Sequence, residues 1–249
     1  MILLIVVLAL FTAWLSFTPP GLDGKLHAAG YSVCHQIESH SLTVGGKVLP
    51  LCARCTGTFL GLLITFVFLS NRKNRGGAPS KGKIALLSLF FAAFALDGIN
   101  SSLTLLPGVI PLYPPDNRLR LFTGLLFGIS LANLVLPLWN QTLYFDWENK
   151  PILETWKQVL ALVVLAAAAG LMILLDIPIL YYPIAFFSTG TILVILSMVY
   201  TLLWCIIFKK ENSLHQFKDG IRILSIGMIS AILQVGIMDI ARWMITKTW

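Results

Sequence analysis

The sequence predicts an all-α, polytopic transmembrane helix bundle of about seven spans, with the N-terminus inside. Hydrophobic residues make up 57% of the 249-residue chain and charged residues only 12%, a balance that ordinary soluble domains do not have. Several apolar runs reach the roughly 20 residues that a helix needs to cross a hydrocarbon core. The runs are continuous instead of alternating, which indicates helices.

Seven apolar segments are expected to span the membrane. The first is closed by Thr18-Pro19-Pro20 and lacks a basic start and a small-residue cleavage site, so we expect an uncleaved anchor instead of a signal peptide. The third is closed by Pro107-Gly108. The expected spans are residues 1–17, 53–70, 84–106, 119–138, 157–175, 183–208 and 222–245.

The spans group into three regions along the chain. Residues 1–30 form an N-terminal membrane anchor and outer linker, and residues 31–138 form a membrane core that carries the Cys and His motifs. Residues 139–249 form a C-terminal membrane region of three spans. We expect a multi-pass protein of the cell membrane, with membrane lipids as its partners and an oligomeric state that the sequence does not define.

Basic residues in short loops predict the orientation. The loop 71–83 holds Lys and Arg residues and no acid, which is typical of a cytoplasmic loop. Alternation then puts 139–156 and 209–221 inside, and 18–53 outside. The net charge of +7 is explained by these loops, and no nucleic-acid partner is indicated.

A cluster of soft ligands precedes the second span, in the outward-facing stretch YSVCHQIESHSLTVGGKVLPLCARCTGTFLG (31–61). Cys52 and Cys55 form a C-x-x-C, which is a usual half-site for zinc. Cys34 and a histidine would complete a tetrahedral Cys₃His shell. His35 is the first choice for that histidine, and His40 is the second because adjacent ligands are geometrically awkward. A tentative zinc site at Cys34, His35, Cys52 and Cys55 is therefore the leading interpretation.

Two other chemistries fit the same cysteines. One is a structural disulfide from Cys34 to Cys52 or Cys55, which would leave one outer thiol over. The other is thiol–disulfide exchange at Cys52 and Cys55, with Cys34 as resolving thiol and a membrane quinone as cofactor. A C-x-x-C at a helix N-terminus favours thiolate, and Arg54 inside the motif adds to that effect.

Polar residues at the outer ends of the third and fourth spans predict a pocket beside the cluster. An acid within a span is costly and marks a candidate functional site, and arginines there suit a phosphate or carboxylate such as an anionic lipid head group. The alternative is that Asp97 pairs with Arg118 or Arg120 and only locks helices together. The pocket candidates are Asp97, Asn100, Asn117, Arg118 and Arg120.

Two similar segments open the second and fourth spans, RCTGTFLG (54–61) and RLFTGLLFG (120–128). We interpret them as ordinary packing motifs in preference to a duplication. Each holds a GxxxG pair, Gly57/Gly61 and Gly124/Gly128, which lets helix backbones approach closely. The second and fourth spans are therefore expected to form a tight central pair.

The seventh span holds Asp239 and Arg242 three residues apart, and an internal ion pair is the favoured interpretation. A third function class, an ion-coupled transporter, would use Asp97 and Asp239 to carry the coupling ion. Transporters of this kind are built from inverted repeats, whereas the similar segments open spans of the same direction. Cys205, in the sixth span, is expected to be a small buried apolar residue.

Four motifs in order resemble a family of predicted bacterial and archaeal membrane proteins of unknown function. They are CHQ (34–36), LCARCTGTFLG (51–61), DGINSS (97–102) and NRLRLFTGLLFG (117–128). The resemblance covers about residues 30–135 and leaves the last three spans outside it. It implies a membrane protein with a Cys/His site and brings no activity with it.

Overall fold

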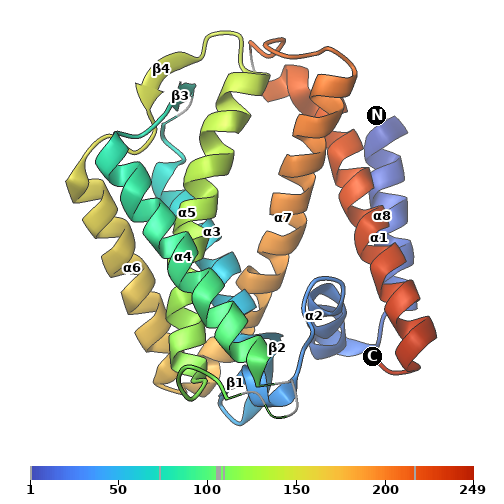
Figure 1. Ribbon diagram of the computed structural model, residues 1–249. Helices are drawn as coiled ribbons and strands as arrows, with labels where there is room; N and C mark the ends of the chain where they lie inside the picture. Colours follow the sequence, from blue (N-terminus) through green and yellow to red (C-terminus); the bar gives the residue numbers. More distant parts are fainter. Residues whose placement is uncertain (1, 73, 105–107, 109, 216) are drawn as a thin grey trace.

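The computed structural model describes residues 2–72, 74–104, 108, 110–215 and 217–249. Within these residues, long helices run up and down between two ends (Figure 1). Met1, Lys73 and the expected end of the third span at 105–107 lie outside the described residues. The helices are α1 (Ile2–Phe17), α2 (Gly21–Tyr31), α3 (Ala53–Leu69), α4 (Lys81–Leu103), α5 (Asn117–Leu143), α6 (Trp156–Leu174), α7 (Tyr181–Ile207) and α8 (Ile221–Thr246).

The predicted all-α polytopic bundle is confirmed. Each expected span corresponds to one helix, from α1 to α8 with α2 as the addition. Five of them, α4 to α8, are long and apolar enough to cross a membrane alone. α1 and α2 pass that test only together and are bent by 108° at their junction, and α3 is a shorter apolar helix. The count of about seven spans and the inside N-terminus stay predictions.

Helices α3 and α5 form the tight central pair that the GxxxG motifs predict. A Cβ atom on Gly57 would lie 2.2 Å from the carbonyl oxygen of Leu121. A Cβ atom on Gly124 would lie 2.3 Å from the carbonyl oxygen of Arg54. Only glycine permits backbones this close. The same approach recurs one turn farther on, at Gly61 and Gly128.

The segment 18–53, expected as an outer loop, holds α2 and a β-hairpin. The hairpin joins β1 (Ser41–Val44) to β2 (Lys47–Cys52) in antiparallel register. Its two-residue turn is Gly45-Gly46, both with positive φ, as tight hairpin turns require. The Gly45 N–H donates to Asp176 Oδ1 at 2.7 Å, so the loop after α6 holds the hairpin tip.

The basic loops meet at the opposite end of the bundle from the hairpin (Figure 1). β3 (Arg75–Gly77) pairs in parallel with β4 (Glu148–Pro151), and Tyr144 bridges to Leu214. Three expected cytoplasmic connections thus lie together. We call this the basic end. The hairpin end is called the cysteine end, because Cys34, Cys52 and Cys55 lie there.

Helices α1 and α8 pack side by side at the edge of the bundle (Figure 1). α1 has no buried residue, although Trp14 Nε1 donates to Asp239 Oδ2 at 2.8 Å. The expected ion pair between Asp239 and Arg242 is wrong. Arg242 turns instead toward the segment after α2, where its guanidinium finds three backbone carbonyls.

Candidate metal centre

Three cysteines from three positions converge at the cysteine end. Cys34 follows the C-terminus of α2, Cys52 ends β2 and precedes α3, and Cys55 lies in the first turn of α3. Their sulfur atoms all lie within 4.8 Å of one another. Among the described residues, no other group of His, Cys, Asp or Glu gathers three ligand atoms this closely.

The three thiols are buried or half-buried and carry no disulfide. The Cys52 backbone N–H donates to Cys34 Sγ at 3.2 Å. Hydrogen bonds from the thiols of Cys52 and Cys55, and a weaker one from His35, hold the pKa of Cys34 well below its usual value. One sulfur is therefore prepared to be a thiolate, which is the form that binds metals.

Two histidines stand beside the cluster. His35 Nε2 lies 3.1 Å from His40 Nδ1, and their rings meet edge to face. Burial, followed by the charge of Arg120, lowers the pKa of His40, which favours the neutral imidazole that metals bind. Neither ring belongs to the three-sulfur group, but the link between His35 and Cys34 puts a ring nitrogen at its edge.

Two side chains fix the backbone around Cys34. Gln36, at positive φ, donates from Nε2 to the carbonyls of His27 at 2.9 Å and Pro50 at 2.7 Å. Arg242 donates to the carbonyls of Tyr31 and His35 at 2.9 Å each and also to that of Cys34. Its guanidinium lies 4.0 Å from the centre of the Tyr31 ring. The Cys-His-Gln motif is thus tied to β2 and to α8.

Asp97 lies beside the cluster and pairs with Arg54, the arginine inside the C-x-x-C. Arg54 Nε donates to Asp97 Oδ2 at 3.1 Å, and its Nη2 donates to the same oxygen. Tyr113 donates its hydroxyl to Asp97 Oδ1 at 3.1 Å. The alternative pairing of Asp97 with Arg118 or Arg120 is therefore wrong. Asp97 is buried, and its carboxylate holds α4 to the start of α3.

The other pocket candidates separate into two groups. Asn100 is buried, and its side chain stabilises the backbone before α5: it donates to the Tyr113 carbonyl and accepts from the Leu112 N–H. By contrast, a polar cavity of about 490 Å³ is lined by Asn117, Arg118 and Arg120 together. This cavity is the part of the expected pocket that is open.

Arg120 is the deepest charge of that cavity. It is 4% exposed, and it donates to Asn117 Oδ1 and to Ser101 Oγ at 2.6 Å each. Its Nε–H has no partner. Asn117 in turn donates to the carbonyls of Ser39 and Ser41 at 3.1 Å, which ties α5 to the hairpin.

A second cavity, of about 260 Å³, lies beside this polar network. It is lined by His35, His40, Arg54 and Ser101 among others. Because Ser101 accepts from Arg120, the two cavities share a wall. This smaller cavity is lined by the chain neighbour of Cys34, His35, and by Arg54 of the C-x-x-C, so it offers imidazole and guanidinium groups next to the residues of the cluster.

Comparison with known proteins agrees with the motifs. A family model described as a predicted membrane protein (DUF2085) matches residues 34–134. An uncharacterized protein of Methanothermobacter thermautotrophicus is 30% identical over 105 residues, which cover 41% of this chain and 83% of that protein. The chain belongs to this family. An uncharacterized protein of Methanocaldococcus jannaschii is 26% identical over 119 residues, which cover 48% of this chain and 71% of that protein. No solved structure matches the chain.

The DUF2085 segment contains the three clustered cysteines, all of α4, and α5 as far as residue 134, but Arg242 lies outside it. Sequence reasoning missed the contacts of Gln36 and Arg242. The Cys-His-Gln motif could have indicated a supporting role for Gln36, since it places a side-chain amide next to the expected metal ligands. No local signal could have linked Arg242 to Cys34, because the contact joins residues far apart in the chain.

Proposed function

We propose that this protein is a zinc-binding integral membrane protein of the cell membrane, with the metal centre on the outer face. Cys34, Cys52 and Cys55 would hold the ion, and His35 would complete the shell. The observation that carries the proposal is the convergence of three free thiols within 4.8 Å. Thiolate and imidazole ligands favour zinc among the common metal ions.

The cluster fits zinc with small movements. In a tetrahedral site with Zn–S bonds of about 2.3 Å, ligand sulfurs lie about 3.8 Å apart. Sulfurs within 4.8 Å of one another reach that spacing by side-chain rotation. The ring of His35 now contacts His40. Because His35 is the residue directly after Cys34, a rotation of its side chain would bring the ring to the ion. The bound metal would fasten the segment after α2 to the start of α3.

The polar cavity beside the centre would take an anionic group, such as a lipid phosphate. Arg118 is exposed on its wall, and the buried Nε–H of Arg120 is unpartnered. Guanidinium groups bind phosphate through paired hydrogen bonds. Two acids among the described residues line this cavity, and Oδ1 of the first, Asp116, accepts from the Arg118 N–H. The second is Asp176, whose Oδ1 accepts from the Gly45 N–H.

Cobalt substitution tests the ligand set. Purified protein loaded with Co²⁺ should show intense thiolate charge-transfer bands, and Cys34→Ser should lose most of that intensity. His35→Ala should shift the visible bands, whereas His40→Ala should leave them in place. Cys205→Ser is the matched control, because Cys205 is buried at the basic end and bonds to the Lys210 carbonyl. A spectrum without thiolate bands would refute the metal centre.

Side-specific labelling tests the orientation. Lys47→Cys puts a thiol on the exposed hairpin, and Glu211→Cys puts one on the exposed loop at the basic end. A membrane-impermeant maleimide added to intact cells should label the first variant and spare the second. The reverse pattern would place the cysteine end inside.

A stability assay tests the anion site. Adding phosphatidylglycerol to protein in a neutral detergent should raise the thermal midpoint, and phosphatidylcholine should raise it less. Arg118→Gln should remove this difference because Arg118 lines the cavity. Lys247→Gln, a charge change at the same end but outside the cavity, should preserve it. An unchanged difference in Arg118→Gln would refute the site.

The second candidate is quinone-linked thiol oxidation, favoured by the same three free thiols and the lowered pKa of Cys34. Cys52 and Cys55 would form a disulfide, and a quinone would take up the two electrons and two protons. Acid quenching and thiol trapping from growing cells separates the two functions. A Cys52–Cys55 disulfide that is present in respiring cells, and gives way to free thiols when respiration is blocked and the quinone stays reduced, would favour this candidate over zinc.

A further inference from the structure

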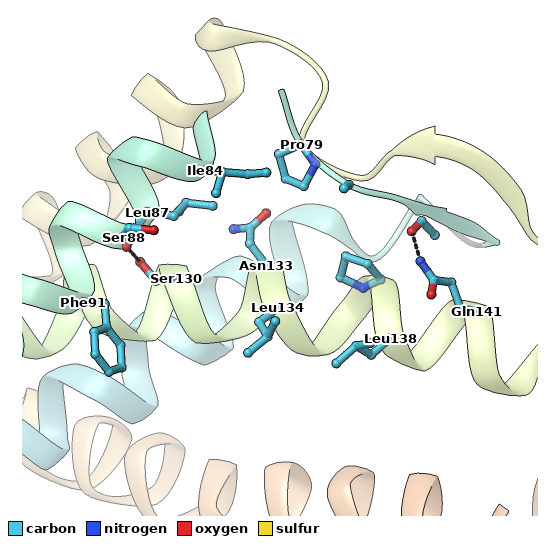
Figure 2. A pocket seen from close by; sticks show the side chains of 13 residues that line it. Pro79, Ile84, Leu87, Ser88, Phe91, Ser130, Asn133, Leu134, Leu138 and Gln141 are labelled. Carbon is cyan, nitrogen blue, oxygen red and sulfur yellow. Dashed lines mark hydrogen bonds between the residues drawn. The ribbon is translucent and has the colours of Figure 1, made fainter. Parts of the chain in front are cut away.

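A second site lies at the basic end, away from the cysteines. A cavity of about 450 Å³ opens between the start of α4 and the later part of α5, with β3 beside it (Figure 2). Its lining is apolar apart from a few uncharged polar groups, and no charged side chain of the described residues borders it. Ile84, Leu134 and Leu138 on its rim are each at least 45% exposed, so it opens toward the lipid.

One polar group in this cavity lacks a partner. Asn133 is 4% exposed and projects from α5 into the space beside Leu87 and Pro79 (Figure 2). Its Nδ2 donates to the Ile129 carbonyl at 2.9 Å, but its Oδ1 accepts no hydrogen bond. A buried acceptor without a donor costs about 1–3 kcal/mol. Such a group inside a cavity points to a ligand that donates.

A proline increases the shortage of donors at the same place. Pro137 lies inside α5 and lines the cavity. Proline has no N–H, so the α-helical hydrogen bond to the carbonyl four residues earlier, that of Asn133, is missing. Ser130, one turn earlier on α5, cannot supply the missing donor, because its hydroxyl already donates to the carbonyls of Leu87 and Leu126. Acceptors therefore outnumber donors around Asn133.

The depth of Asn133 in the cavity and the lack of charged lining residues limit the kinds of ligand that could bind. Asn133 lies about two turns, or about 12 Å, from Gln141 at the edge of the cavity, and Gln141 is engaged by the Gly76 carbonyl. A phospholipid head group would need charged partners, and no charged side chain of the described residues lines the cavity. An aromatic ring carrying a hydroxyl fits better, because its O–H is a stronger donor than an alkyl hydroxyl and its rigid body loses little entropy on binding.

We propose that the cavity between α4 and α5 binds an uncharged, membrane-soluble molecule of the phenol class, whose hydroxyl donates to Asn133 Oδ1. The ring lies among Pro79, Leu87 and Pro137, and the molecule enters laterally from the lipid past Leu134. This site is independent of the proposed zinc centre. Asn133 lies about 20 Å along α5 from Arg120, the buried arginine of the polar cavity at the cysteine end.

The test compares two probes that differ in one hydrogen-bond donor. 1-Naphthol and 1-methoxynaphthalene share a ring system, but only the first has an O–H. Binding is measured as the ligand-dependent rise in thermal midpoint of the full chain in one detergent, so that partition into micelles is the same for every variant. Wild type should bind 1-naphthol about tenfold more tightly than the methyl ether.

Three variants assign the contact. Asn133→Leu should reduce the affinity for 1-naphthol about tenfold and leave that for the ether unchanged. Ser130→Ala, in the same cavity, should bind both probes as wild type does. Ser88→Phe fills the cavity from an exposed position on α4 and should abolish both interactions, which keeps the test decisive if Asn133→Leu does not fold. Equal binding of the two probes by wild type, or 1-naphthol binding that survives in Ser88→Phe, would overturn the proposal.

Discussion

Two helix pairs hold the two halves of the cysteine cluster in different ways. α3 and α5 meet backbone to backbone through four glycines, and the start of α3 carries Cys52 and Cys55. α1 and α8 lie at the edge of the bundle, and α1 has no buried residue. Yet α8 supplies Arg242, which holds the backbone of Cys34 and His35.

The two helix pairs therefore have different roles: the α3–α5 pair supports the fold, and the α1–α8 pair supports only part of the cluster. Removing the contact between α3 and α5 should disrupt the fold itself, because the helix axes cannot move apart slightly while keeping their packing. Removing Arg242 should leave the fold standing and loosen only the half of the cluster that follows α2. The four predictions below test this division, from the largest expected effect to the smallest.

Gly57→Leu should prevent the central pair from forming. Even the Cβ atom would lie 2.2 Å from the Leu121 carbonyl oxygen, so we expect a loss of about 3 kcal/mol or more in the free energy of unfolding. The control is Gly190→Leu, since a Cβ atom on Gly190 in α7 would meet nothing within 4 Å. Denaturation in detergent measures both. Equal stability of the two variants would contradict the packing described for α3 and α5.

Asp97→Asn should be the next most harmful change. Asp97 and Arg54 have side chains that are only 2% and 16% exposed, and removing one partner of a buried pair strands the other charge. We expect a loss of about 3 kcal/mol in the free energy of unfolding. Restoring stability by the second change Arg54→Met would show that the stranded charge was the cause, whereas additive losses would argue against a pair.

Arg242→Gln should weaken zinc binding with little loss of stability. The side chain supplies three hydrogen bonds to the backbone around Cys34 and His35, and loss of such supporting contacts typically costs 10–100-fold in metal affinity. Competition with a chromophoric chelator measures the affinity. Lys247→Gln, a charge change just past the end of α8, is the control. Unaltered affinity in Arg242→Gln would mean that α8 plays no part in the site.

Lys47→Ala should have no measurable effect on the thermal midpoint. Lys47 pairs with Asp23 at 2.9 Å, but both side chains are about half exposed, and exposed pairs contribute little because solvent and salt screen them. A clear drop in the midpoint would show that the hairpin at the cysteine end depends on this contact more than its exposure implies.

The spans and the central pair could be predicted because their signals are local. Continuous apolar runs define each helix from α3 to α8 within a few residues. A GxxxG pair is a five-residue motif that by itself indicates close helix packing. The cysteine cluster was also within reach, since Cys52 and Cys55 share the first turn of a helix and Cys34 precedes them by a short segment.

The contacts that complete the site could not be predicted in the same way. α2 follows a double proline and holds three glycines, so its propensity is low, and packing of Ala28, Ala29 and Tyr31 stabilises it instead. Three arginines, Arg54, Arg118 and Arg120, lie near enough in the sequence motifs to be partners of Asp97. The ion pair forms with Arg54, because the fold brings the start of α3 beside α4. Such choices depend on non-local geometry.

Metal content of the native protein tests the central claim most directly. Protein purified in detergent under reducing conditions, with no metal added, should carry about one zinc per chain by elemental analysis. Cys34→Ser should lose that zinc, and Cys205→Ser should retain it. Wild-type protein that is folded and fully reduced, yet holds no metal and binds none on titration with zinc, would contradict the account.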